Sequence, residues 1–227
     1  MNTPIPYLDA VILASTAYPS GLVHSLLSAW RTPTPAPGTP AASRSISTGL
    51  LAILVLPYAA LAPAVWVIQP KLLLLHVTSV WMLAVAILFV PVALMMEYAI
   101  HAFPAYRTTG QFFRGIVIQN PWPGKLSLPD HLLLAAIAIG EEVFFRMIWL
   151  GALLALGLPA PLAILISSLA YGLNHLMFGG ISVASKTVTG CIYGSLYLLG
   201  GQCIWLPIVT HVLQNLTLFL VAGRRNA

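Results

Sequence analysis

Long apolar segments fill most of this 227-residue chain and constrain its fold more than any other feature of the sequence. Only 7% of the residues are charged, whereas soluble domains carry about 25%. A membrane-spanning helix needs about 20 mostly apolar residues. Stretches of this kind occupy residues 8–30, 46–68, 72–100, 132–158, 161–178, 183–199 and 204–222. The sequence therefore predicts an all-α polytopic membrane helical bundle of about seven transmembrane helices, or six if the first lies flat.

The basic residues indicate how this bundle is oriented in a lipid bilayer. Lys and Arg collect in cytoplasmic loops of membrane proteins. Here they follow the first, third, fifth and seventh segments, and only Lys71 lies on the opposite side. This pattern predicts an integral membrane protein with a cytoplasmic C-terminus. The net charge of +5 does not indicate nucleic-acid binding, because the ten Lys and Arg are scattered along the chain.

Three charged residues interrupt the predicted span 132–158 near its middle: Glu141, Glu142 and Arg146. A charge at the bilayer centre costs about 2.5–3.5 kcal/mol on insertion scales, so such residues indicate a functional site. Glu142 and Arg146 are four residues apart and can pair on one helix face. Glu141 is rotated by about 100° from Glu142 and needs a partner elsewhere. A purely structural Glu–Arg pair, with Glu141 facing a polar channel, is the alternative.

Two later segments carry polar residues at a similar depth. His175 lies in segment 161–178, while His211 and Asn215 share one face of segment 204–222. At about 1.5 Å per residue, their depths agree with that of the glutamates to within roughly 10 Å. Either histidine alone would usually be a packing residue that hydrogen-bonds to another helix. Together they predict a polar pocket that could deprotonate water and hold an oxyanion. Gly190 and Gly194 predict close approach between two helices.

The order of these residues resembles a known family of membrane proteins. Three spaced motifs occur on separate segments: Glu141-Glu142-x-x-x-Arg146, Tyr171-x-x-x-His175 and His211-x-x-x-Asn215. They are similar to those of the CPBP family (CAAX protease and bacteriocin-processing, also called Abi), which includes the type II CAAX prenyl endopeptidases. The resemblance covers residues 130–222. Tyr171 departs from the Phe that is usual in the family and adds a hydroxyl near the pocket.

The resemblance implies an intramembrane endopeptidase of the glutamic type. It implies that Glu141 activates water with His175 as its partner. His211 and Asn215 would stabilise the oxyanion. Glu142, Arg146 and Tyr171 would support the shape of the site. The catalytic core would then occupy residues 131–227, after N-terminal segments and a cytoplasmic loop in residues 1–130, within one membrane domain. A bacterial inner (plasma) membrane is the expected location.

The resemblance leaves the cofactor and the substrate less defined. No cofactor is expected, although Glu141, His175 and His211 could alternatively bind a divalent metal such as zinc. The expected substrate is a membrane-anchored or hydrophobic-tailed peptide or protein, with CAAX-type, sorting-signal and leader processing all open. Two other classes of function also stay open. One is a non-enzymatic bacteriocin-immunity or membrane scaffold protein of the same family, and the other is a small transporter with a carboxylate proton relay.

Overall fold

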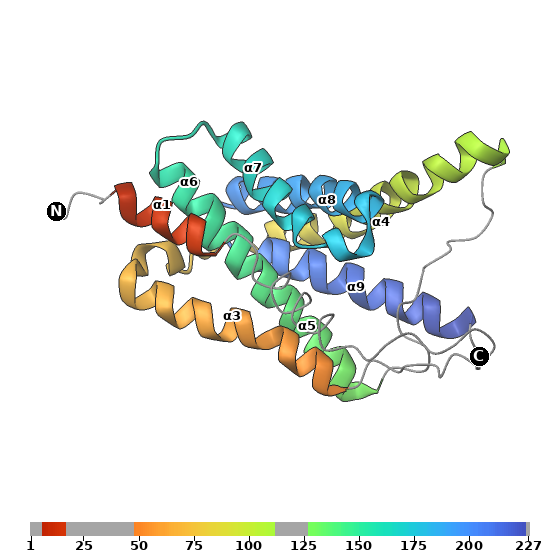
Figure 1. Ribbon diagram of the computed structural model, residues 1–227, viewed down its shortest axis with the longest axis horizontal. Helices are drawn as coiled ribbons and strands as arrows, with labels where there is room; N and C mark the ends of the chain where they lie inside the picture. The colour runs from red at the N-terminus through yellow and green to blue at the C-terminus, as the bar shows by residue number, and fades with distance from the viewer. Residues whose placement is uncertain (1–5, 17–47, 112–126, 226–227) are drawn as a thin grey trace, which may run out of the picture.

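The computed structural model describes residues 6–16, 48–111 and 127–225, and in these ranges the chain is helical, without a strand (Figure 1). The α-helices are α1 (Pro6–Ser15), α3 (Thr48–Ile68), α4 (Val80–Thr109), α5 (Leu128–Glu142), α6 (Gly151–Ala155), α7 (Ala160–Leu173), α8 (Gly180–Leu199) and α9 (Trp205–Arg225). Two short 3-10 helices, η1 (Pro70–Leu73) and η3 (Leu176–Phe178), and one π-helix, η2 (Val143–Leu150), connect them. This arrangement confirms the predicted all-α bundle.

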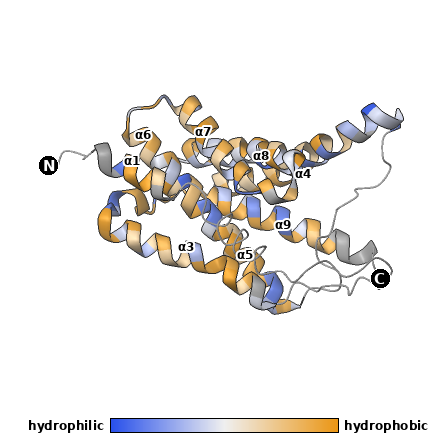
Figure 2. Cartoon of the chain, viewed as in Figure 1, coloured by the Kyte–Doolittle hydropathy of each residue, from blue (hydrophilic) through white to orange (hydrophobic). Residues whose placement is uncertain are grey.

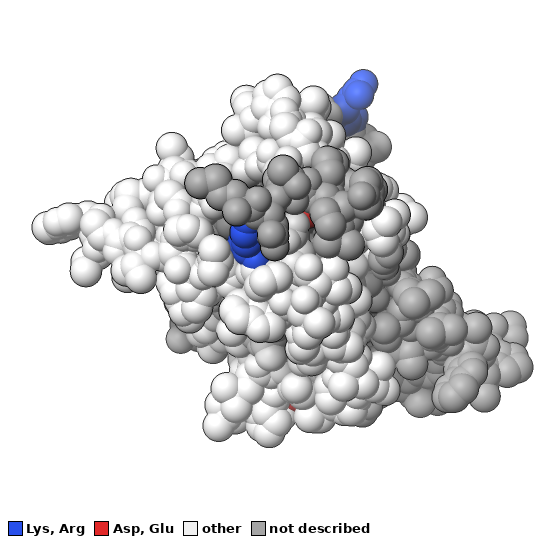
Figure 3. Space-filling model, turned by 90° about the vertical axis from the view of Figure 1, so that its left-hand side faces the viewer, with Lys and Arg blue, Asp and Glu red and all other residues white. Residues whose placement is uncertain are grey.

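Helices α3 and α4 are long and apolar enough to cross a membrane, as judged by length and composition. Only 22% and 17% of the residues in their apolar stretches are buried inside the molecule. Large apolar side chains such as Val67, Trp81 and Leu88 therefore face outward, and α3 is mostly apolar along its length (Figure 2). Few Lys, Arg, Asp or Glu atoms reach the described surface drawn in Figure 3. Soluble monomers rarely expose apolar surface on this scale, so the bundle suits a lipid environment.

The third predicted span, 72–100, differs most from the helix observed. The structure starts α4 eight residues later, at Val80, and extends it to Thr109. Pro70 instead begins η1, and non-helical residues 74–79 follow it. Gly110 ends α4 with a φ of 66°, where its N–H donates to the Tyr106 carbonyl. Of the first predicted span, 8–30, only the part up to residue 16 lies within the described residues.

The predicted span 132–158 is a continuous helical path from α5 through η2 to α6. Its start is fixed by a capping box, in which the Ser127 side chain accepts from the Asp130 N–H and Asp130 accepts from the Ser127 N–H. Thr48 also donates to Asp130, at 2.8 Å, so α3 and α5 begin side by side (Figure 1). The wider π-helical turns begin directly after Glu142. The sequence predicted a regular α-helix over this span. The π-helical segment is a difference of interest, because such segments are often found at functional sites.

Helices α7 and α8 approach each other closely at small residues. A Cβ atom on Gly190 would lie 3.0 Å from Ser168 Cβ, and one on Gly194 would lie 3.2 Å from Ile164 Cγ2. This confirms the close approach predicted for the two glycines. A further glycine on α7, Gly172, has even less room, because its Cβ would lie 2.7 Å from the Val183 carbonyl oxygen. Gly172 therefore determines how close the end of α7 lies to α8, and His175 follows three residues later.

We expect Gly172→Ala to destabilise the protein by about 1–3 kcal/mol, because the added methyl group would overlap the α8 backbone. Gly180→Ala is the matched control, since no atom lies within 4 Å of a Cβ at that helix start. It should leave stability unchanged or raise it slightly. Thermal unfolding of both variants in the same detergent measures the difference. Equal midpoints for the two would show that α7 and α8 are not in the close contact described.

Candidate active site

The three predicted motifs meet at one buried cluster. Glu141 and Glu142 come from the end of α5, Arg146 from η2, Tyr171 from α7, His175 from the turn before η3, and His211 from α9. Glu142, Arg146, Tyr171 and His211 are at most 2% exposed, and Glu141 is 6% exposed. The His175 side chain is the most open of the group, at 15%. The structure thus brings together six of the seven residues singled out in the sequence.

The Glu142 carboxylate is paired on both sides. Its Oε2 lies 3.1 Å from Arg146 Nε as an ion pair, and its Oε1 accepts a hydrogen bond of 2.7 Å from His211 Nδ1. The Arg146 guanidinium also lies over two aromatic rings, 4.9 Å from the centre of Tyr171 and 5.5 Å from that of Tyr193. Cation–π contacts of this kind offset part of the cost of burying the cation. The predicted Glu142–Arg146 pair is therefore confirmed.

Glu141 points away from this pair and lies between two imidazoles. Its Oε1 is 3.8 Å from His175 Nε2, and its Oε2 is 3.8 Å from His211 Nε2. Both distances are too long for a direct hydrogen bond. Glu141 therefore has the partners on other helices that its isolation in the sequence required.

Hydrogen bonds at Nδ1 of His175 and His211 determine the tautomer of each ring, and so whether Nε2 faces Glu141 with a hydrogen or with a lone pair. His175 Nδ1 lies 3.0 Å from the Tyr171 carbonyl oxygen, which can only accept, so Nδ1 carries the hydrogen. His211 Nδ1 donates to the Glu142 carboxylate in the same way. In the neutral rings both Nε2 atoms are then acceptors. The Glu141 carboxylate and these two Nε2 atoms are thus three acceptors that face one another. A proton, a water molecule or a cation is needed among them.

Tyr171 and Asn215 differ in how closely they join the cluster. The Tyr171 hydroxyl lies 3.4 Å from His211 Nε2, close enough for a weak hydrogen bond. Asn215 lies one turn beyond His211 on α9 and is half-buried. Within the described ranges the Asn215 side chain makes no hydrogen bond, so its amide can donate to a ligand. The structure places Asn215 on the predicted helix face without joining it to the other six residues.

Sequence reasoning missed Tyr193, which touches the cluster, and Gln214, which binds Tyr193. Tyr193 of α8 stacks on the His211 ring, with 5.0 Å between the ring centres and 23° between the planes. Its hydroxyl donates to the side-chain oxygen of Gln214. A glutamine in an apolar span was the available signal for Gln214, since such a group needs a partner there. Tyr193 gave none, because tyrosine is common in membrane helices.

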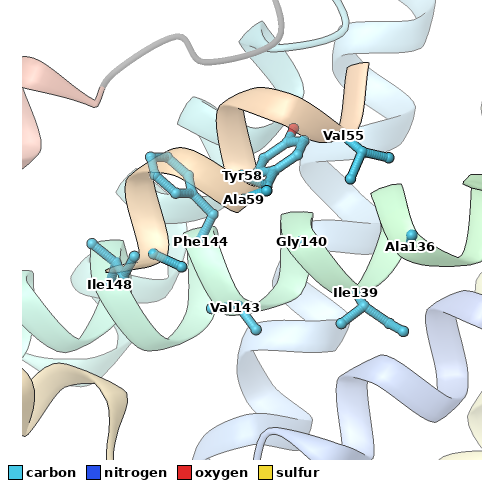
Figure 4. Close-up of a pocket in the computed structure, with 10 residues that line it drawn as sticks. Val55, Tyr58, Ala59, Ala136, Ile139, Gly140, Val143, Phe144 and Ile148 are labelled. Atoms are coloured by element: carbon cyan, nitrogen blue, oxygen red, sulfur yellow. The ribbon is translucent and has the colours of Figure 1, made fainter. Parts of the chain in front are cut away.

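An apolar cleft of about 210 Å³ adjoins the cluster between α3 and α5. Val55 and Tyr58 of α3 lie above Gly140, the residue before Glu141 (Figure 4). A Cβ on Gly140 would lie 2.8 Å from Tyr58, so only glycine fits this close approach. The Tyr58 hydroxyl accepts a 3.2 Å hydrogen bond from Asn174, the neighbour of His175. Gly140 and Tyr58 thus place the wall of the cleft next to Glu141 and next to Asn174, the residue before His175.

No metal-binding group of three or more His, Cys, Asp or Glu is present among the residues that the structure describes. The residues that come nearest to such a set are Glu141, His175 and His211, as their order in the sequence indicated. Their two Nε2 atoms and one carboxylate are ligand types that zinc accepts. They are equally suited to hold a water molecule.

Comparison with known proteins agrees with this assembly. Residues 126–217 match the model of a family described as type II CAAX prenyl endopeptidase Rce1-like. The match includes all seven site residues and confirms the resemblance to CPBP proteins that the motif order indicated. Rce1-like proteins are membrane-embedded CAAX proteases. Neither the curated proteins nor the solved structures gave a match to this chain.

Proposed function

We propose that this chain is an intramembrane endopeptidase in which Glu141 activates a water molecule to cleave a membrane-anchored peptide or protein. The observation that carries this proposal is the convergence of Glu141 with the Nε2 lone pairs of His175 and His211. A water molecule supplies two hydrogens to such acceptors and keeps its own lone pairs for attack. The similarity of residues 126–217 to a protease family supports the peptidase class.

In the proposed reaction the bridging water donates one hydrogen to Glu141 and the other to His175. Its oxygen forms a bond to the scissile carbonyl carbon while one proton passes to the Glu141 carboxylate. The tetrahedral intermediate then loses its amine as the C–N bond breaks, and Glu141 returns the proton to the departing nitrogen. The products are a new carboxylic acid and a new amine, so the water is fully accounted for.

The developing oxyanion needs hydrogen-bond donors. The Asn215 amide can donate directly. His211 can donate from Nε2 once the ring has taken up a proton from solvent, and Glu142 at its Nδ1 stabilises that imidazolium, as a buried carboxylate does in other acid–base sites. Arg146 is the ion-pair partner of Glu142 on its other oxygen. These roles agree with those that the family resemblance implied.

We also propose that the substrate carries a hydrophobic or prenylated anchor that lies in the apolar cleft between α3 and α5. The cleft adjoins Gly140 and, through Tyr58 and Asn174, the backbone that carries His175. An apolar tail held there would bring its neighbouring peptide bond toward Glu141. The family description points to CAAX-type tails, and sorting signals or leader peptides have similar apolar segments.

We expect Glu141→Gln to reduce cleavage by about 10²–10⁴-fold, because the amide cannot accept a proton from water. Proteomics of C-termini and membrane-retained fragments would compare cells that carry the wild type or this variant. At least one fragment should appear only with the wild type. Asp130→Asn is the matched control, since it also changes a carboxylate to an amide in α5 but lies at the helix start.

Full complementation by Glu141→Gln, with no fragment that differs, would contradict the peptidase proposal. A non-enzymatic immunity or scaffold role, in which the polar cluster only joins the helices, would then account for the protein. Proton-coupled flux into liposomes would instead indicate a transporter.

We propose that the mechanism needs no cofactor, and metal analysis tests this against the zinc alternative. The alternative has physical merit, because metal-bound histidines are often held by a carboxylate at the other nitrogen, as Glu142 holds His211. We expect purified active protein to contain well below one zinc per chain and to keep its activity in strong chelators. Stoichiometric zinc that is lost in His211→Ala would establish the metal mechanism instead.

We propose that the protein lies in the bacterial plasma membrane with its C-terminus in the cytoplasm. The support is the distribution of Lys and Arg between alternate loops together with the apolar outer faces of α3 and α4. Reporter fusions in the connection after Gly110 and after Arg225 should both report the cytoplasm. A fusion that reports the outside at either position would show that the number of spans or the orientation is different.

A further inference from the structure

A second network of buried polar groups connects three helices to the site. Glu97 lies within the apolar helix α4, where a charge requires a partner. Lys186 provides it, with Nζ 2.9 Å from Glu97 Oε1 and both side chains only about 15% exposed. The sequence pattern placed Lys186 beside the turn after the fifth segment, and the structure places it in the first half of α8, where it pairs with Glu97 of α4. The ion pair therefore has a position inside the bundle.

Gln214 of α9 extends this network in a fixed direction. It is fully buried, and its Nε2 donates to Glu97 Oε2 at 2.5 Å. Because a carboxylate can only accept, the amide nitrogen must face Glu97 and the amide oxygen must face away. That oxygen accepts from the Tyr193 hydroxyl. The charge on Glu97 thus determines that Tyr193 is a hydrogen-bond donor.

Tyr193 transmits this constraint to His211. Its ring stacks nearly parallel on the imidazole at 5.0 Å, and the Arg146 guanidinium lies 5.5 Å from the same ring centre. The hydrogen bond from His211 Nδ1 to Glu142 fixes one atom of the imidazole but leaves its plane free to rotate about that bond. The stacked ring of Tyr193 fixes the plane. Together the two contacts direct Nε2 toward Glu141.

We propose that Glu97, Gln214 and Tyr193 are positioning residues that hold the plane of the His211 ring for the reaction, with Lys186 balancing the charge of Glu97. The inference rests on the proposed function, in which His211, with a proton taken up from solvent at Nε2, donates a hydrogen bond to the oxyanion. A tilt of the imidazole moves Nε2 from its productive place, and small displacements of catalytic groups can reduce rates strongly. None of the four residues is a specified position of the three sequence motifs, although Gln214 lies between His211 and Asn215.

The first test removes only the Tyr193 hydroxyl. In Tyr193→Phe the ring remains but its hydrogen bond to Gln214 is lost, so kcat should fall about three- to tenfold, the equivalent of one hydrogen bond, while KM stays unchanged. Tyr197→Phe is the matched control. Tyr197 lies one turn further along α8, is equally buried and packs among apolar side chains away from His211. Its kcat should equal that of the wild type.

The second test separates positioning from simple stabilisation of the bundle. The double variant Glu97→Lys with Lys186→Glu restores an ion pair between α4 and α8. A lysine at 97 can only donate, so the Gln214 amide would turn over and present its nitrogen to the Tyr193 hydroxyl. We expect the double variant to regain the thermal midpoint lost in Glu97→Lys while its kcat stays as low as in Tyr193→Phe. Recovery of both would mean that the ion pair only joins the helices.

Glu141→Gln, assayed on the same peptide, separates the two proposals. The peptide is the one that cellular cleavage identifies as a substrate of the wild type. If Glu141→Gln retains full activity, or the wild type cleaves nothing that this variant spares, the proposed function fails and the positioning role fails with it. If Glu141→Gln is inactive while Tyr193→Phe and Tyr197→Phe have equal kcat, only the positioning role is overturned.

Discussion

The burial of the Glu142 carboxylate is the constraint on which the rest of the site depends. A fully buried carboxylate is costly unless charges and hydrogen bonds surround it. Arg146 meets this need from the same helix and His211 from α9, so both oxygens of Glu142 face a partner. Glu141, the next residue back, necessarily points in another direction around the helix. Glu142 thus joins α5 to α9, and Glu141 is left facing the Nε2 atoms of His175 and His211.

The same need for partners determines which helices lie together. Apolar helices in lipid gain little from hydrophobic burial against one another, so polar contacts and small residues select the pairs. Glu142 and His211 connect α5 to α9, and Glu97 connects α4 to α8 and α9. Gly172 allows α7 to approach α8 so closely that the turn containing His175 is held beside the site. The polar network that performs the proposed chemistry is therefore also part of what specifies the fold.

Sequence reasoning could predict the features that follow from the cost of burying charge. Glu142 and Arg146 had to pair at a spacing of four, and Glu141 had to find a partner on another helix. It could not predict the π-helical turns after Glu142, because a regular period is the only local expectation. Nor could it place Lys186, since a lysine near a helix end is usually a loop charge. Its partner Glu97 is 89 positions away in the chain, and only the packing of α4 on α8 brings the two together.

The hydroxyl of Tyr171 distinguishes the two histidines within the proposed mechanism. A buried phenol needs a hydrogen-bond partner, and His211 Nε2 lies 3.4 Å away. While Tyr171 donates there, the lone pair of His211 is partly occupied, whereas that of His175 remains open to water. The bridging water is then held by Glu141 and His175, the more exposed of the two imidazoles. His211 is kept for the later step, in which its Nε2 has taken up a proton from solvent and donates to the oxyanion in place of accepting from Tyr171. A phenylalanine at this position would leave the Nε2 lone pairs of both histidines equally open to water. The tyrosine therefore separates the role of His175, which holds water, from that of His211, which stabilises the oxyanion, more strictly than the family motif requires.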